Sequence, residues 1–164
     1  MPKLSVLLDQ IDAETLLLPE FQRGYVWNRD QVRGLFRSLY LGYPVGSLLT
    51  WQTDAGDTEL RGSTADSGVR EILLDGQQRL TSLYGVVRGR PPEFFEGKAS
   101  TFDGLHFNAD TESFEFYAPV KMKNDPAWYS VTEIYELGMG PIFGRLMMID
   151  DREVAALRAA RLGR

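Results

Sequence analysis

The sequence lacks most of the residues on which common metal sites and disulfide scaffolds depend. It has no cysteine, and His106 is the single histidine among 164 residues. A disulfide framework, a thiolate metal site and a histidine cluster are therefore excluded. Long apolar runs are also missing, because no segment approaches the roughly 18 apolar residues that a membrane-spanning helix requires. We expect a cytoplasmic protein that does not contact a membrane.

A basic excess is missing too. The formal net charge is -5, so bulk electrostatic attraction does not bring this chain to nucleic acid, and any phosphate contact requires a local site. With 43% hydrophobic residues, a chain of this length can bury one core. We expect one domain over residues 1–140 and the start of a further helical region over residues 141–164, in a chain cut from a longer protein.

The apolar pattern predicts a mixed α/β (α+β) chain. Helical spacing and capping residues predict five helices: one from residue 4, one after Asn28 and one over residues 76–88. The other two are VTEIYEL, with Ser130 and Glu133 as a possible capping box, and a helix that begins at Asp150 with Glu153 in the same spacing. Extended segments are expected at residues 16–18, at 46–51 as a buried strand, at 70–74, and in a hairpin of LHFN and SFEFY. His106 falls in that hairpin, where a structural or exposed role is expected instead of that of a general base.

The stretch ILLDGQQRLTSLYG has an unusual polar centre. Asp75 and Gly76 would form a tight turn if a second strand followed. The apolar residues that follow instead have helical spacing, so we predict a strand, a bend and the N-terminus of a helix. Such an end presents unpaired backbone N–H groups and a partial positive charge, which suit an anion such as phosphate.

Polar side chains around this bend strengthen the phosphate hypothesis. Hydrogen-bonding groups suited to phosphate follow within one to two helical turns: Gln77, Gln78, Arg79, Thr81 and Ser82. A carboxylate beside phosphate is repulsive unless a cation bridges them, so Asp75 suggests bound Mg²⁺. The alternative is that Asp75 caps the helix, a contribution of about 0.5 to 2 kcal/mol, while Arg79 pairs with a nearby acid. Spacing alone leaves both interpretations open.

A second polar segment, PEFQRGYVWN, contains Gln22 and Arg23 followed by two alternating aromatic residues. Tyr25 and Trp27 beside an arginine suit the stacking of a nucleobase, since any base offers a π-face. The alternative is that these rings are ordinary core or edge residues.

The order of the motifs FQRGYVW, GYPVGS and ILLDGQQRLTSLYG resembles the N-terminal domain of GmrSD-type, modification-dependent restriction systems, a DGQQR-motif family related to ParB and sulfiredoxin. The resemblance covers roughly residues 4–90 and extends more loosely to Tyr135. It implies a ParB/sulfiredoxin-like fold, with a small mixed sheet and flanking helices. It also implies that nucleoside triphosphates are bound or hydrolysed through the DGQQR segment, and that nuclease chemistry resides in a separate C-terminal domain or subunit.

The resemblance leads to two hypotheses. In the first, the chain is an NTP-binding and NTP-hydrolysing module of a DNA restriction or phage-defence protein, with Asp75 holding Mg²⁺ and with Gln78 and Arg79 as further catalytic residues. In the second, it is a non-catalytic DNA-binding or assembly domain that uses the same site as a nucleotide switch. DNA is then a partner of the full-length protein, and the oligomeric state is left open. The expected nucleotide-binding residues are Gln22, Arg23, Gly76, Gln77, Gln78, Arg79, Thr81 and Ser82.

Overall fold

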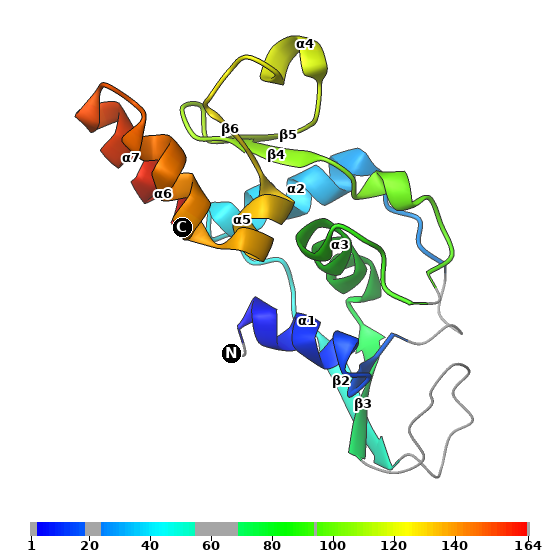
Figure 1. Ribbon diagram of the computed structural model, residues 1–164. Coiled ribbons are helices and arrows are strands. Elements are labelled where there is room, and N and C mark those ends of the chain that lie inside the picture. The colour runs from blue at the N-terminus through cyan, green and yellow to red at the C-terminus, as the bar shows by residue number, and fades with distance from the viewer. Residues whose placement is uncertain (1–2, 19–23, 55–68, 94, 164) are drawn as a thin grey trace.

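The computed structural model describes residues 3–18, 24–54, 69–93 and 95–163 (Figure 1). Within these ranges the chain forms helices and two small three-stranded sheets, which confirms the predicted mixed α+β class. The first sheet has the order β1 (Leu16–Leu17), β3 (Val69–Asp75), β2 (Leu49–Asp54), and the second has the order β5 (Ser113–Phe116), β4 (Leu105–Asn108), β6 (Trp128–Ser130). Helix α3 (Gln77–Arg88) lies between the two sheets (Figure 1).

The first sheet is mixed because its central strand has one parallel and one antiparallel neighbour. Strand β1 follows α1 (Leu4–Asp12) and runs parallel to β3, while β2 runs antiparallel to it. The register of β2 shifts between Leu49 and Thr50. The expectation of a buried strand over residues 46–51 is wrong in two respects: the strand begins at Leu49, and Leu49 and Trp51 are more than half exposed. The reason is that β2 is an edge strand, so only one of its sides is paired with a neighbour.

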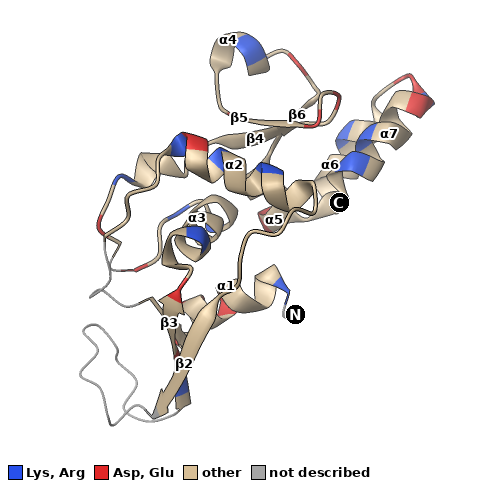
Figure 2. Cartoon of the chain, turned by 180° about the vertical axis from the view of Figure 1, so that it is seen from behind, with Lys and Arg blue, Asp and Glu red and all other residues tan. Residues whose placement is uncertain are grey.

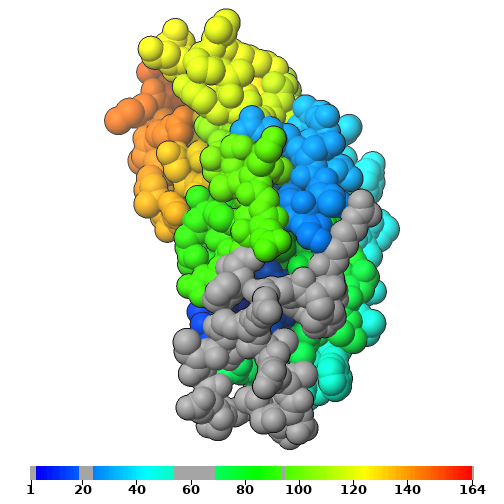
Figure 3. All heavy atoms as spheres, turned by 90° about the vertical axis from the view of Figure 1, so that its right-hand side faces the viewer, coloured from blue at the N-terminus to red at the C-terminus, as the bar shows by residue number. Residues whose placement is uncertain are grey.

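Helix α2 (Arg29–Tyr40) begins where the sequence predicted. Asn28 Oδ1 accepts a hydrogen bond from Gln31 N at 3.1 Å, and Gln31 Oε1 accepts one from Asn28 N at 3.0 Å, which completes a capping box. Arg29 then donates to the Ser100 carbonyl at 2.7 Å. Figure 3 shows the green segment around residue 100 lying against α2 (blue). This contact brings the chain between α3 and β4 alongside α2.

Helix α3 is buried on most of its surface, unlike a typical amphipathic helix. Leu80 and Val86 are fully buried, and Tyr84 is 2% exposed. A Cβ at Gly85 would lie 2.4 Å from Phe102 Cγ, so only glycine allows this ring to pack so closely. The C-cap of the helix is Gly89, which has a φ of 64°. A glycine in this left-handed conformation commonly ends a helix, and α3 ends at Arg88, where the predicted range of residues 76–88 ends.

The second half of the chain contains the predicted hairpin, formed by β4 and β5. Ser130 Oγ accepts from Glu133 N at 3.3 Å and caps α5 (Val131–Leu137), as expected. The remaining elements are a 3₁₀ turn (Ala99–Thr101), α4 (Pro119–Met122), α6 (Met139–Met147) and α7 (Arg152–Leu162). Among the described residues, no helix is both long and apolar enough to cross a membrane.

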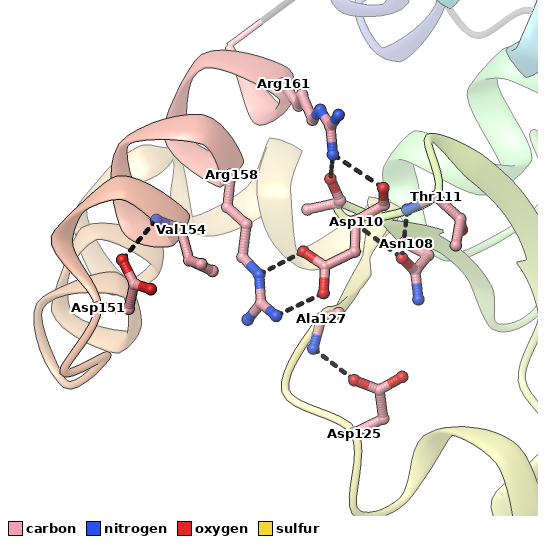
Figure 4. Close-up of polar contacts among 10 residues, drawn as sticks. Asn108, Asp110, Thr111, Asp125, Ala127, Asp151, Val154, Arg158 and Arg161 are labelled. Carbon is pink, nitrogen blue, oxygen red and sulfur yellow. Dashed lines mark hydrogen bonds and ion pairs between the residues drawn. The ribbon is translucent and has the colours of Figure 1, made fainter.

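The last helix begins one residue later than predicted. Its N-cap is Asp151, not Asp150, because Asp151 Oδ1 accepts hydrogen bonds from Glu153 N and Val154 N at 2.9 and 3.2 Å (Figure 4). Either aspartate can accept such bonds, and the backbone geometry of the preceding turn decides between them. Sequence spacing alone does not contain that information.

A bidentate salt bridge joins α7 to the turn of the β4–β5 hairpin. Arg158 Nε and Nη2 donate to the two carboxylate oxygens of Asp110 at 2.7 and 2.6 Å, and Arg161 donates to the Ala109 and Asp110 carbonyls (Figure 4). Arg158 is only 8% exposed. The hydrogen bond from Arg158 holds the pKa of the Asp110 carboxyl below its ordinary value.

This pair predicts a pH-dependent stability. A carboxyl whose pKa is lowered by folding contributes stability above its unfolded pKa of about 3.9, and that contribution is lost as the pH falls through the lower folded value. We expect Asp110→Asn to lower the free energy of unfolding at pH 7 by about 1 to 2 kcal/mol, because Arg158 loses its charged partner. Melting curves should show the gap between wild type and variant narrowing below about pH 4. A gap that is constant down to pH 2 to 3 would contradict this role.

Candidate functional site

The DGQQR segment forms a strand, a bend and a helix, as predicted. Strand β3 ends at Asp75, Gly76 turns the chain, and α3 starts at Gln77. Gly76 has a φ of 96°, and a Cβ there would lie 2.4 Å from Leu48 Cδ2. Glycine is therefore required at this bend for both its conformation and its lack of a side chain. An acidic residue lies where β3 meets α3 (red between these elements in Figure 2).

Asp75 does not cap the helix. The N-cap is Gly76, and α3 has no side-chain cap hydrogen bond, so the capping alternative for Asp75 is wrong. The carboxylate instead pairs with Arg79, whose Nη2 lies 3.1 Å from Asp75 Oδ2. The Asp75 side chain is 70% exposed and that of Arg79 is 17% exposed. An acid open to solvent thus stands at the end of β3, one helical turn from a mostly covered guanidinium.

Arg79 lies in a slot between Gly46 and Gly76, and a Cβ at Gly76 would lie 3.1 Å from Arg79 Nη2. Its Nη1 donates to the Val45 carbonyl at 2.8 Å, and a Cβ at Gly46 would lie 2.7 Å from the same nitrogen. Gly46 also has a φ of 86°. The sequence alone indicates no role for the GYPVGS motif. The structure shows that this motif supplies the wall against which the arginine of DGQQR rests.

Gln78 holds the second motif in place. Its Oε1 accepts hydrogen bonds from Val26 N at 2.9 Å and Trp27 N at 3.3 Å, and its Nε2 donates to the Gly24 carbonyl at 3.3 Å. Both ends of the amide are therefore bonded to the backbone of residues 24–27. The DGQQR and FQRGYVW motifs are in contact through this one side chain.

The side chains of Thr81 and Ser82 in α3 lie inside the protein. Ser82 is fully buried and donates to the Gln78 carbonyl at 2.6 Å, so the Tyr25 hydroxyl, 2.8 Å away, donates to Ser82. Thr81 is 4% exposed. The Tyr25 ring packs edge-on against Phe95 and Phe102 with centroids 5.4 and 5.1 Å away. Burial raises the pKa of Tyr25, and the hydrogen bond with Ser82 partly opposes this.

Other expected residues are placed as follows. Gln77 is the first residue of α3, next to the bend, whereas Gln22 and Arg23 lie outside the described residues. His106 is half-buried in the hairpin with Nδ1 2.9 Å from the Gly104 carbonyl, a structural arrangement. Within the described residues, no group of three or more acidic, histidine or cysteine side chains forms a metal cage. Asp75 offers one exposed carboxylate, a donor set that fits Mg²⁺ only when phosphate oxygens and water complete the shell.

Comparison with known proteins finds a relative and a family for this chain. The chain is 35% identical over 81 residues to the uncharacterized protein MJ0686 of Methanocaldococcus jannaschii, a match that covers 43% of this chain and 14% of that relative. The chain thus corresponds to a small part of the relative's length. Residues 4–138 match the family of the GmrSD restriction endonuclease, N-terminal domain. This match spans the bend, the Arg79 slot and both sheets, and the chain therefore belongs to the GmrSD N-terminal domain family.

Proposed function

We propose that this chain is the nucleotide-binding domain of a restriction protein that acts in phage defence, and that the bend between β3 and α3 binds the phosphates of a nucleoside triphosphate. Family membership supports the restriction context. The observation that carries the ligand assignment is the geometry of the bend: an exposed carboxylate, a side-chain-free turn at Gly76 and the N-terminus of a 12-residue helix meet at one point.

Each residue of the bend has a distinct role in this proposal. Gly76 makes the bend through its positive φ and leaves room for Leu48 and Arg79, and Gln77 is the first residue of α3 beside it, where the helix N-terminus would face phosphate. Arg79 supplies the cation, because its Nη2 already faces the acidic side of the bend. Asp75 would hold Mg²⁺, which when bound neutralises phosphate charge. Thr81 and Ser82 support the bend from inside the protein instead of touching the ligand.

One observation favours the switch over the hydrolase. Gln78 and Arg79, the two further residues expected in catalysis, are bonded to the backbone of residues 24–27 and to the Val45 carbonyl. A ligand that moves the Arg79 guanidinium therefore also moves the segment around Val45, because the two are hydrogen-bonded. We infer that nucleotide binding is transmitted to these two segments, and through them to DNA or to the nuclease domain or subunit of the whole protein.

Calorimetric titration with ATP and GTP, paired with a phosphate-release assay with and without Mg²⁺, tests this function. We expect saturable binding that Mg²⁺ strengthens. Phosphate release above background would identify a hydrolase, whereas binding without release would identify a switch. Failure to bind either nucleotide with or without Mg²⁺ would overturn the proposal. The same titration with a nucleoside that lacks phosphates is the control, and it should show far weaker binding.

A further inference from the structure

Hydrogen bonds hold the backbone at Trp27 and at the next residue close to the proposed phosphate site. The Trp27 backbone N–H donates to Gln78 Oε1 at 3.3 Å, and Gln78 is the second residue of α3. The next residue, Asn28, is fixed by the capping box of α2. The backbone of Trp27 is thus held between α3, which begins at the bend, and α2, so the Trp27 side chain starts close to the DGQQR motif.

The structure gives Tyr25 and Trp27 of the FQRGYVW segment different surroundings. The Tyr25 ring is part of the protein interior, since it packs on Phe95 and Phe102 and its hydroxyl bonds to Ser82. The Trp27 ring is half-buried, and within the described ranges it joins neither an aromatic pair nor the hydrophobic core. Among the described residues, no aromatic or core contact accounts for this partly exposed indole, whose backbone is bonded to the first turn of α3.

We propose that Trp27 is the platform on which the nucleobase stacks while the phosphates occupy the bend; this inference rests on the proposed function. A stacked ring accepts any base, because every base has a π-face, and contact area makes purines better ligands than pyrimidines. The site then takes purine nucleoside triphosphates with little discrimination between adenine and guanine. The base contact adds affinity that inorganic tripolyphosphate does not have.

Titrations of the protein with ATP, GTP, CTP and tripolyphosphate, followed by tryptophan fluorescence and calorimetry, test this platform. We expect ATP and GTP to quench emission and to bind about tenfold more tightly than tripolyphosphate. Trp27→Ala should reduce ATP and GTP affinity to that of tripolyphosphate and leave tripolyphosphate binding unchanged. Trp27→Phe should retain most of the ATP affinity but abolish the quench, because a ring remains while the reporting indole is gone.

Trp51→Phe is the matched control. Trp51 is 52% exposed on the neighbouring strand β2, and its replacement should leave the quench by ATP and GTP unchanged. The outcomes separate the two proposals. If tripolyphosphate binds and Trp27→Ala keeps the full preference for ATP, the platform is wrong while the phosphate site stands. If neither ATP nor tripolyphosphate binds the wild type, both are wrong. Unchanged tripolyphosphate affinity and a normal melting curve in Trp27→Ala exclude misfolding as the cause of a loss.

Discussion

Replacement of Arg79 by alanine should weaken ATP or GTP binding by about 1.5 to 3 kcal/mol, the range of a charge-assisted hydrogen bond. The structure adds a second effect. Arg79 donates to the Val45 carbonyl and fills the slot beside Gly46, so its loss leaves that carbonyl without its donor. We therefore also expect the free energy of unfolding to fall by about 1 kcal/mol. Calorimetric titration paired with a denaturant melt measures both quantities on the same protein.

Arg79→Lys separates the two effects. Lysine keeps the positive charge but has one compact donor group, so it cannot reach Val45 and Asp75 with separate nitrogens as the guanidinium does. We expect Arg79→Lys to recover part of the nucleotide affinity and little of the lost stability. Wild-type affinity in Arg79→Ala would remove this residue from the ligand site and leave it a purely structural link between DGQQR and GYPVGS.

Asp75→Asn should reduce Mg²⁺-dependent phosphate release by about a hundredfold if the chain is a hydrolase, because the carboxylate that would hold the metal at the bend is gone. If the chain binds without hydrolysis, the same substitution should remove the enhancement of affinity by Mg²⁺. Metal-free binding should persist or improve, since a negative charge beside the phosphates is gone. Phosphate release and calorimetry with and without Mg²⁺ measure these effects.

Asp75→Asn is expected to change the free energy of unfolding too little to affect these measurements. Gly76 is the N-cap, and the Asp75 carboxylate is mostly exposed, so losing its ion pair with Arg79 costs at most about 0.5 kcal/mol. Asp30→Asn is the matched control, because Asp30 is an exposed acid paired with Arg33 one turn along α2. It should behave like wild type in every assay. Undiminished Mg²⁺ dependence in Asp75→Asn would remove the metal role assigned to this residue.

The features that the sequence determined by itself are those set by neighbours within one or two helical turns. The spacing after Gly76 excluded a hairpin and predicted α3, Gly89 marked its end, and Asn28 marked the start of α2. These follow from backbone dihedral preferences and from side chains that bond to N–H groups three residues away. The position of the bend, and hence the centre of the candidate site, was predictable for the same reason.

Only the tertiary structure determines which partner each polar side chain contacts. Gln78 meets residues 24–27, Arg79 meets Val45, and Arg158 meets Asp110, contacts that join segments 34 to 54 residues apart in the chain. Polar residues on a helix predict contact with solvent or ligand, but here α3 packs against α2 and α5, and its Thr81 and Ser82 are buried. Sequence spacing fixes the direction of a side chain relative to its own helix, and only packing decides which partner, solvent or ligand lies in that direction.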